Sequence, residues 1–204
     1  QAEDGIRDCL LSRWLGDVYK RQADIIAVFS NFKKTAINIS FMRSGSNFGA
    51  VSSNEQLIKN LKYVNSAIDD GAKLRIGGKQ INKNTGGFYM EPTIFSDVDN
   101  QMTIAKEEVF GPVLSVIKCK NEEDAVQIAN DTNYGLAAAV WTSDLSKAHR
   151  MIKSIRAGVV HVNCYGGADI TVPLGGVKQS GNGHDRSLHA LEKYTDLKTA
   201  WISL

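Results

Sequence analysis

The sequence is poor in the residues that mark several classes of protein. It has 3 cysteines, 3 prolines and 4 histidines in 204 residues, without the spacing of a metal site. The cysteines, Cys9, Cys119 and Cys164, form no pair, which indicates a reduced, cytoplasmic compartment rather than a disulfide framework. The apolar runs are far shorter than a membrane span, and a net charge of +2 indicates no nucleic-acid surface. We therefore expect no metal, no membrane and no nucleic-acid partner.

The residues that are present describe a globular α/β chain. Hydrophobic residues make up 43% of it, enough to bury a core. Strand-like runs at 113–119, 136–142 and 159–163 are separated by two helical patterns, which Asn121 and Asp144 can cap. Such alternation with short connections predicts parallel strands and right-handed crossovers. We expect an open, mostly parallel sheet with helices on both faces, followed by a helix at 185–194 and a C-terminal strand arm at 198–204.

A further helix is predicted upstream of these runs. Ser53 can cap it, with Gln56 at the third position, and Gly71 can end it. Its predicted buried stripe consists of Leu57, Leu61, Val64 and Ile68. A short strand is expected at 73–76, and a strand-like stretch at 88–98 is interrupted by Pro92.

The stretch Lys106-Glu107-Glu108-Val109-Phe110-Gly111-Pro112-Val113 joins a carboxylate and an aromatic ring to a Gly-Pro turn. The residue before a proline is pushed out of the α region, so this stretch bends at the mouth of the strand-like run that follows. Functional side chains often occupy such places in α/β proteins. The alternative is a surface loop with an exposed glutamate and a half-buried phenylalanine.

The motif KEEVFGPV is followed, in order, by NDTNYGLAAAVWT, AGVVHVNCY, VPLGGVKQSGNG and the closing LHALEKYTDLKTAWISL. Together these motifs resemble the C-terminal half of an NAD(P)-dependent aldehyde dehydrogenase, from about Asn47 to Leu204. The closing segment most resembles the branch that oxidises amino-aldehydes such as γ-glutamyl-γ-aminobutyraldehyde. The resemblance implies oxidation of an aldehyde to the acid, with NAD or NADP as cofactor.

The resemblance also implies roles for particular side chains. Glu108 matches the glutamate that binds the hydroxyls of the nicotinamide ribose, and Phe110 matches the residue packed near that ribose. The loop from Asn163 to Gly176 matches the wall of the aldehyde tunnel, with substrate positions at Gly166, Ala168, Asp169 and Leu174. Leu174 departs from the usual phenylalanine, and Asp169 is either a substrate contact or a solvated loop acid.

The nucleophile is missing. The family pattern Phe-x-Asn-x-Gly-Gln-x-Cys has its nearest match at residues 29–36, where Ala36 stands in place of the cysteine. The general-base glutamate is absent too, and no Gly-x-Gly-x-x-Gly fingerprint marks a cofactor domain. We interpret Cys119 and Cys164 as small buried residues. We therefore assign no catalytic residue and expect the chain alone to be inactive.

We divide the chain into four parts. Residues 1–22 match nothing in the family and are interpreted as a non-native leader, with an amphipathic helix as the alternative. Residues 23–46 are a disrupted remnant of the nucleophile region, and residues 47–196 are the catalytic-domain portion. Residues 197–204 form an oligomerisation strand, and we expect a homo-oligomer through Lys198–Leu204. The alternative function is a non-catalytic module that oligomerises or binds a partner.

Overall fold

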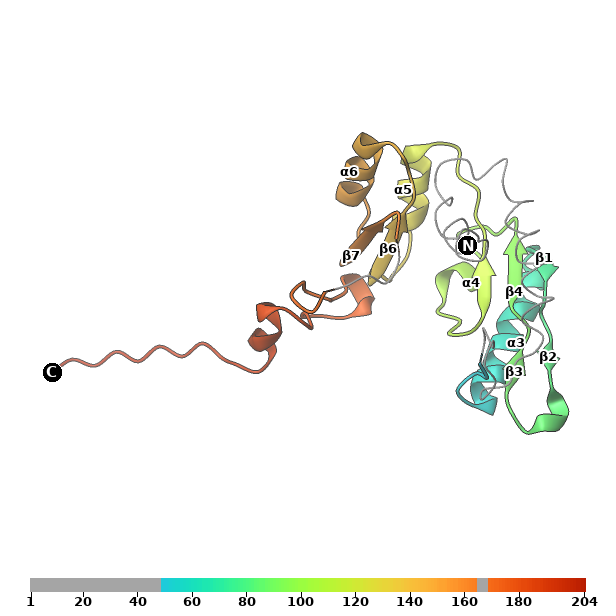
Figure 1. Cartoon of the computed structure of the whole chain (residues 1–204), viewed down its shortest axis with the longest axis horizontal. Helices are drawn as coiled ribbons and strands as arrows, with labels where there is room; N and C mark the ends of the chain where they lie inside the picture. The colour runs from blue at the N-terminus through green and yellow to red at the C-terminus, as the bar shows by residue number, and fades with distance from the viewer. Residues whose placement is uncertain (1–48, 165–168) are drawn as a thin grey trace, which may run out of the picture. The chain divides into compact units, whose positions relative to one another are not determined.

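The computed structural model describes residues 49–164 and 169–204. These residues group into two compact units, 49–121 and the described part of 122–204, which are treated separately below (Figure 1). The predicted leader, Ala36 and the substrate positions Gly166 and Ala168 lie outside the described residues.

The first unit combines helices with two small sheets. A long helix comes first, and a short helix lies between the last two strands. In chain order the elements are α3 (Asn54–Asp69), β1 (Lys73–Ile76), β2 (Gln80–Ile81), the 3₁₀ turn η1 (Lys83–Thr85), β3 (Tyr89–Met90), β4 (Thr93–Ser96), α4 (Thr103–Lys106) and β5 (Val113–Ser115). One sheet has the order β1-β4-β5, and β2 pairs with β3. The core lies between α3 and β4, where Leu57, Val64 and Phe95 are buried.

Helix α3 begins and ends as the sequence predicts. The Ser53 hydroxyl accepts a hydrogen bond from the Gln56 amide at 3.2 Å, and Gly71 follows the helix with φ of +96°. The predicted stripe is wrong at one end, because Ile68 is 46% exposed. Asn60 and Ala67 are buried instead, so the buried face of α3 includes one polar residue.

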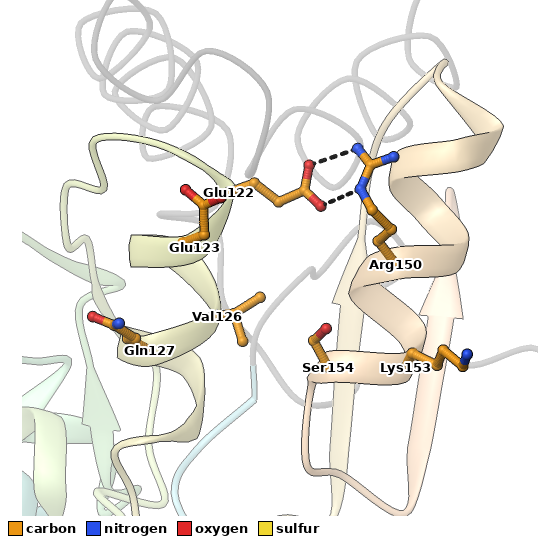
Figure 2. A pocket seen from close by; sticks show the side chains of 7 residues that line it. All are labelled: Glu122, Glu123, Val126, Gln127, Arg150, Lys153 and Ser154. Atoms are coloured by element: carbon orange, nitrogen blue, oxygen red, sulfur yellow. Dashed lines mark hydrogen bonds and ion pairs between the residues drawn. The ribbon is translucent and has the colours of Figure 1, made fainter.

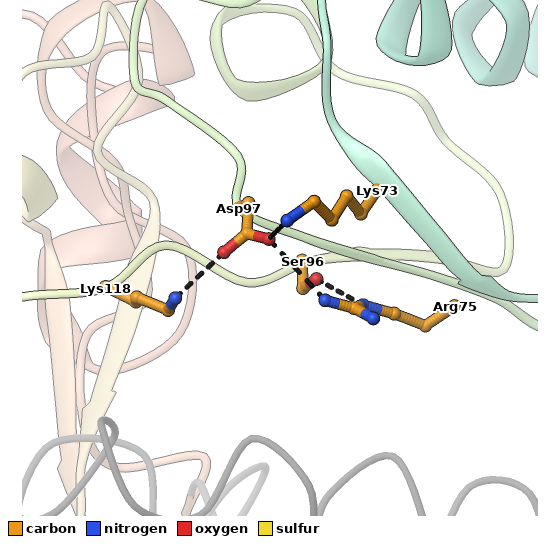
Figure 3. Close-up of polar contacts among 5 residues, drawn as sticks. All are labelled: Lys73, Arg75, Ser96, Asp97 and Lys118. Atoms are coloured by element: carbon orange, nitrogen blue, oxygen red, sulfur yellow. Dashed lines mark hydrogen bonds and ion pairs between the residues drawn. The ribbon is translucent and has the colours of Figure 1, made fainter.

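The Asp97 carboxylate forms ion pairs with residues on or next to the strands on either side of β4. Asp97, directly after β4, accepts from Lys118 at 2.9 Å and lies 3.0 Å from Lys73 of β1 (Figure 3). Arg75 of β1 donates to the Ser96 hydroxyl at 2.6 Å. The hydrogen bonds from Lys118 and Lys73 lower the pKa of Asp97 to about 2, so its carboxylate stays charged across the physiological range.

The second unit contains a parallel pair of strands with a helical crossover. Its elements in chain order are α5 (Glu122–Asn130), β6 (Ala137–Val140), α6 (Leu145–Ser154), β7 (Val159–Val162) and the 3₁₀ segments η2 (Lys178–Ser180) and η3 (Leu188–Lys193). The Asp144 carboxylate caps α6 by accepting from the Lys147 amide at 3.0 Å, as predicted. The apolar pattern of this helix predicts Ala148, Met151, Ile152 and Ile155 on its inward face; three of them are buried, whereas Ile152 is exposed. The parallel β6–β7 pairing is also confirmed.

Two of the four described strand pairings are parallel. Within the first unit β4–β5 is parallel, while β1–β4 and β2–β3 are antiparallel, and in the second unit β6–β7 is parallel. The α/β class holds, and one open, mostly parallel sheet stays a prediction. The directions of these pairings follow from the connections: a parallel pair needs a long crossover, which α6 supplies between β6 and β7, while no α-helix separates β1 from β4.

The C-terminal segment forms no strand within the described chain, so the expected strand arm stays a prediction. Residues 195–204 contain no helix or strand, and Trp201 is 92% exposed (Figure 1). A strand exists only by hydrogen bonding to a neighbour, and no described strand pairs with this segment. The helix expected at 185–194 is the shorter 3₁₀ segment η3. Within the described residues, no helix is long and apolar enough to cross a membrane.

Candidate functional site

The predicted bend is a real feature of the first unit. Helix α4 ends at Lys106, and β5 begins at Val113, with Pro112 accepting a hydrogen bond from the β4 residue Thr93 at 2.8 Å. Residues 107–112, called the 107–112 bend below, therefore connect a helix to a strand that is paired in the sheet. Because both ends are anchored, the side chains between them are held on a fixed backbone.

Glu108 and Phe110 both point away from the core of this unit. Glu108 is exposed, and Phe110 is 70% exposed at a φ of +54°. A left-handed backbone at an aromatic residue costs about 1–3 kcal/mol and persists only where its surroundings hold it. The surface-loop alternative expects an exposed Glu108, as observed, and a half-buried Phe110, which is more exposed than that. A strained backbone that displays a ring and a carboxylate is suited to contact a ligand.

Sequence reasoning missed the groups that hold this bend from α3. The Gln56 side-chain amide donates to the Val109 carbonyl oxygen at 2.9 Å, from 53 residues earlier in the chain. Gln56 was interpreted only as part of a capping box, and a contact at that sequence separation has no local signal. The buried Asn60 lies beside it on α3.

In the second unit, the loop from residue 163 to residue 176 begins at the end of β7. The Asn163 side chain both accepts from the Thr142 amide and donates to the Thr142 carbonyl, each at 2.9 Å, and so fixes the start of the loop to the end of β6. At the other end, Leu174 is half-buried and its amide donates to Asp185 at 2.8 Å. The loop is thus anchored on both sides.

Asp169 lies in this loop as an exposed acid. Its carboxylate accepts from the Thr171 amide at 2.8 Å, and this hydrogen bond lowers the pKa of Asp169. The carboxylate is therefore ionised at neutral pH and able to contact a cation. Asp169 and Leu174 belong to the second unit, and Glu108 and Phe110 belong to the first.

The two described cysteines differ from the expected small buried residues. Cys119 is half-buried after β5, and Cys164 is exposed, because it follows β7 at the start of the loop. Among the described residues, no group of three histidine, cysteine or acidic side chains is placed to hold a metal ion.

A groove between α5 and α6 was not anticipated from the sequence. Arg150 of α6 donates through two nitrogens to Glu122 of α5, at 2.7 and 2.8 Å, and Lys153 and Gln127 line the groove below (Figure 2). This two-pronged hydrogen bonding lowers the pKa of Glu122. Because the pair is solvent-exposed, its net contribution to stability is small, and it serves to fix one helix against the other.

Most of the sequence matches known proteins. The model of the aldehyde dehydrogenase family matches residues 23–200, so the chain belongs to the aldehyde dehydrogenase family. A curated relative, the NADP/NAD-dependent aldehyde dehydrogenase PuuC of Escherichia coli, is 63% identical over 113 residues, which cover 55% of this chain and 23% of the relative. Cytosolic aldehyde dehydrogenase 1 of Mus musculus is 45% identical over 163 residues, covering 80% of this chain and 32% of that protein.

Solved structures agree with this assignment of the family and of its α/β fold. The indole-3-acetaldehyde dehydrogenase AldA of P. syringae, in complex with NAD+ and IAA, has a TM-score of 0.85 and 50% identity, covering 91% of this chain and 38% of that one. The aldehyde dehydrogenase KauB of Pseudomonas aeruginosa has a TM-score of 0.84 and 51% identity over the same shares. The chain spans between about a quarter and two fifths of the length of the relatives it matches.

Proposed function

We propose that these residues form part of an enzyme that oxidises an aldehyde to the acid, with NAD+ or NADP+ bound partly by the 107–112 bend. The observation that carries this proposal is the exposed pair Glu108 and Phe110 on a strained, anchored backbone in a chain of this family. An ionised carboxylate can accept hydrogen bonds from both hydroxyls of a ribose, and an exposed ring can pack against its face. The cofactor itself supplies the hydride acceptor.

The supporting case for NAD+ comes from relatives that were solved with it bound, such as AldA. In this chain the proposed contacts are limited to Glu108 and Phe110, because no dinucleotide-binding fingerprint is present in the 204 residues. We accordingly propose the domain division given above, with residues 47–196 as the catalytic-domain portion and residues 23–46 as a disrupted remnant. The leader at residues 1–22 and a cytoplasmic location remain part of the same proposal.

Replacing Glu108 tests the cofactor contact. The test uses a chimera in which residues 49–204 follow the N-terminal part of PuuC, nucleophile included. Glu108→Gln should weaken NAD+ affinity and the rate of hydride transfer about ten- to a hundredfold, because a hydrogen bond to a charged acceptor is worth about 1.5–3 kcal/mol. Calorimetric titration and single-turnover kinetics measure both quantities. Glu107→Gln, an adjacent exposed carboxylate, is the matched control; changes within twofold for both variants would remove Glu108 from the site.

The amino-aldehyde preference is proposed on Asp169 and on the resemblance of the closing segment to the amino-aldehyde branch of the family. A carboxylate at a tunnel mouth gives a cationic tail a partner and raises its local concentration. In the same chimera, Asp169→Asn should lower kcat/KM for an amino-aldehyde by about two- to fivefold, as for a screened surface contact of up to 1 kcal/mol. The value for a neutral aldehyde of equal length should not change. An unaltered ratio of the two kcat/KM values would exclude Asp169 as a substrate contact. Gly166, Ala168 and Leu174 complete the proposed substrate positions.

A second candidate function, association through the C-terminal segment, is favoured by a specific observation. Leu197, Trp201, Ile202 and Leu204 are all exposed apolar residues, and the backbone around them forms no strand within the chain. An exposed apolar segment whose backbone groups are unpaired can pair with a strand of another chain.

The corresponding prediction concerns the state of association. Sedimentation velocity of the 204-residue chain at micromolar concentration should show dimers or larger species, which should diminish when residues 198–204 are deleted. Trp201→Ser with Ile202→Ser should act in the same direction, whereas Lys198→Ser should not, because it removes no apolar surface. A clean monomer with the segment intact would refute association through this segment.

A further inference from the structure

Asn60 is an unusual residue for the place it occupies. It lies on α3 between Leu57 and Val64, and its exposed fraction is 0%. Burying an amide without hydrogen bonds costs free energy, so such a side chain is kept where its partners are provided. The partners of Asn60 lie in the 107–112 bend and in its own helix.

The Asn60 amide is satisfied when its nitrogen faces two backbone carbonyls. In this orientation it donates to the Val109 oxygen at 2.7 Å and to the Gln56 carbonyl oxygen at 3.2 Å. In this orientation the Asn60 nitrogen also lies 2.7 Å from the Gln56 side-chain nitrogen, so the Gln56 amide has to present its oxygen instead. The hydrogen bond from Gln56 to the Val109 oxygen, at 2.9 Å, belongs to the opposite orientation, in which Gln56 also donates to the Asn60 Oδ1 at 2.7 Å. Val109 stands between Glu108 and Phe110, and its carbonyl is therefore held from α3 at the centre of the bend.

Gly111 completes this contact from the other side. A Cβ built on Gly111 would overlap the Asn60 side-chain amide and would lie 2.7 Å from its Cγ. Asn60 thus occupies the space that a side chain at position 111 would need. The bend can approach α3 closely only with glycine at this position.

We infer that Asn60 is a positioning residue, which through the Val109 carbonyl fixes the backbone that displays Glu108 and Phe110. Its relevance to cofactor binding rests on the proposed function, whereas its hold on the bend is a property of the 204-residue chain itself. The two can therefore fail separately: the Glu108→Gln affinity test addresses the first, and the spectroscopic test below addresses the second.

The test is solution NMR of the isotope-labelled 204-residue chain, following the Val109 carbonyl carbon and the Glu108, Phe110 and Gly111 amides. Asn60→Leu keeps the volume but removes the donor, and it should shift these signals while those of β1 stay in place. Asn60→Asp should shift the same signals at neutral pH, where an ionised carboxylate repels the Val109 oxygen. Asn65→Asp, on the exposed side of α3, is the matched control and should shift none of them.

Acid should reverse the effect of Asn60→Asp alone. A protonated carboxyl group donates an O–H to the Val109 oxygen, and burial raises the pKa at which it protonates. A return of the Val109 and Gly111 signals toward wild-type positions on acidification supports positioning by hydrogen bonding. Wild-type signals in Asn60→Leu, or shifts in Asn60→Asp with no reversal, would overturn it. Should Asn60→Asp fail to fold, Gly111→Ala decides: it must displace the Val109 signal by pushing on the amide, and an unmoved signal overturns the inference.

Discussion

A purified polypeptide of these 204 residues is expected to oxidise no aldehyde at the expense of NAD+ or NADP+. In the matching family pattern a cysteine forms the covalent intermediate, and Ala36 stands at that position here. Without a nucleophile the acyl intermediate has no atom to form on, and removal of such a group typically costs about a million-fold in rate. The loss should be complete within the detection limit of reduced-cofactor absorbance.

The assay should use an amino-aldehyde and a neutral aldehyde, with PuuC as the active reference. Cys164 is the exposed thiol of the described residues, so it is the group that could act as a nucleophile in this assay. Turnover that disappears in Cys164→Ser would contradict the prediction and would assign a nucleophile in the 163–176 loop. Turnover that survives that change would indicate a contaminating enzyme.

A second large effect is expected at Gly77, where β1 leads into the hairpin. Gly77 has a φ of +79°, and a Cβ there would overlap the Pro92 carbonyl and lie 2.8 Å from the Thr93 hydroxyl. Gly77→Ala combines left-handed strain with a clash against backbone, and should destabilise the first unit by about 3–5 kcal/mol. Hydrogen exchange of peptides covering β1 and β4 measures the loss in that unit directly.

Gly71→Ala is the matched control for this change. Gly71 also has a positive φ, +96°, but nothing lies within 4 Å of a Cβ built there. Its substitution should cost only the strain, about 1–2 kcal/mol. Equal protection losses for the two variants would show that the close approach of β1 to Pro92 does not matter to stability.

The elements that sequence reasoning predicted well are those with local signals. The Ser53 and Asp144 caps, the end of α3 at Gly71 and the strand at 73–76 all follow from residues within a few positions of one another. The parallel β6–β7 pairing follows from a strand-helix-strand order with a connection long enough for a crossover. In each case one short stretch contains the information.

The features that sequence reasoning missed, got wrong or left open depend on distant neighbours. Asn60 was not among the residues predicted to be buried, and its partner Val109 lies far along the chain. The apolar periodicity of α3 predicted Ile68 in the core, but Ile68 lies at the end of the helix and is exposed. The pairing expected of the segment 198–204 stays a prediction, because a partner strand is not encoded in the segment itself. The residues proposed for the site came from family resemblance, and their geometry came from the structure.

The most direct test of the account is the activity of the chimera that joins the N-terminal part of PuuC to residues 49–204 of this chain. If this chain supplies the second part of an aldehyde dehydrogenase, the chimera should reduce NAD+ with an amino-aldehyde as substrate. That activity should vanish when the nucleophilic cysteine of the supplied part is replaced. A folded chimera that neither binds NAD+ nor turns over any aldehyde would contradict the account.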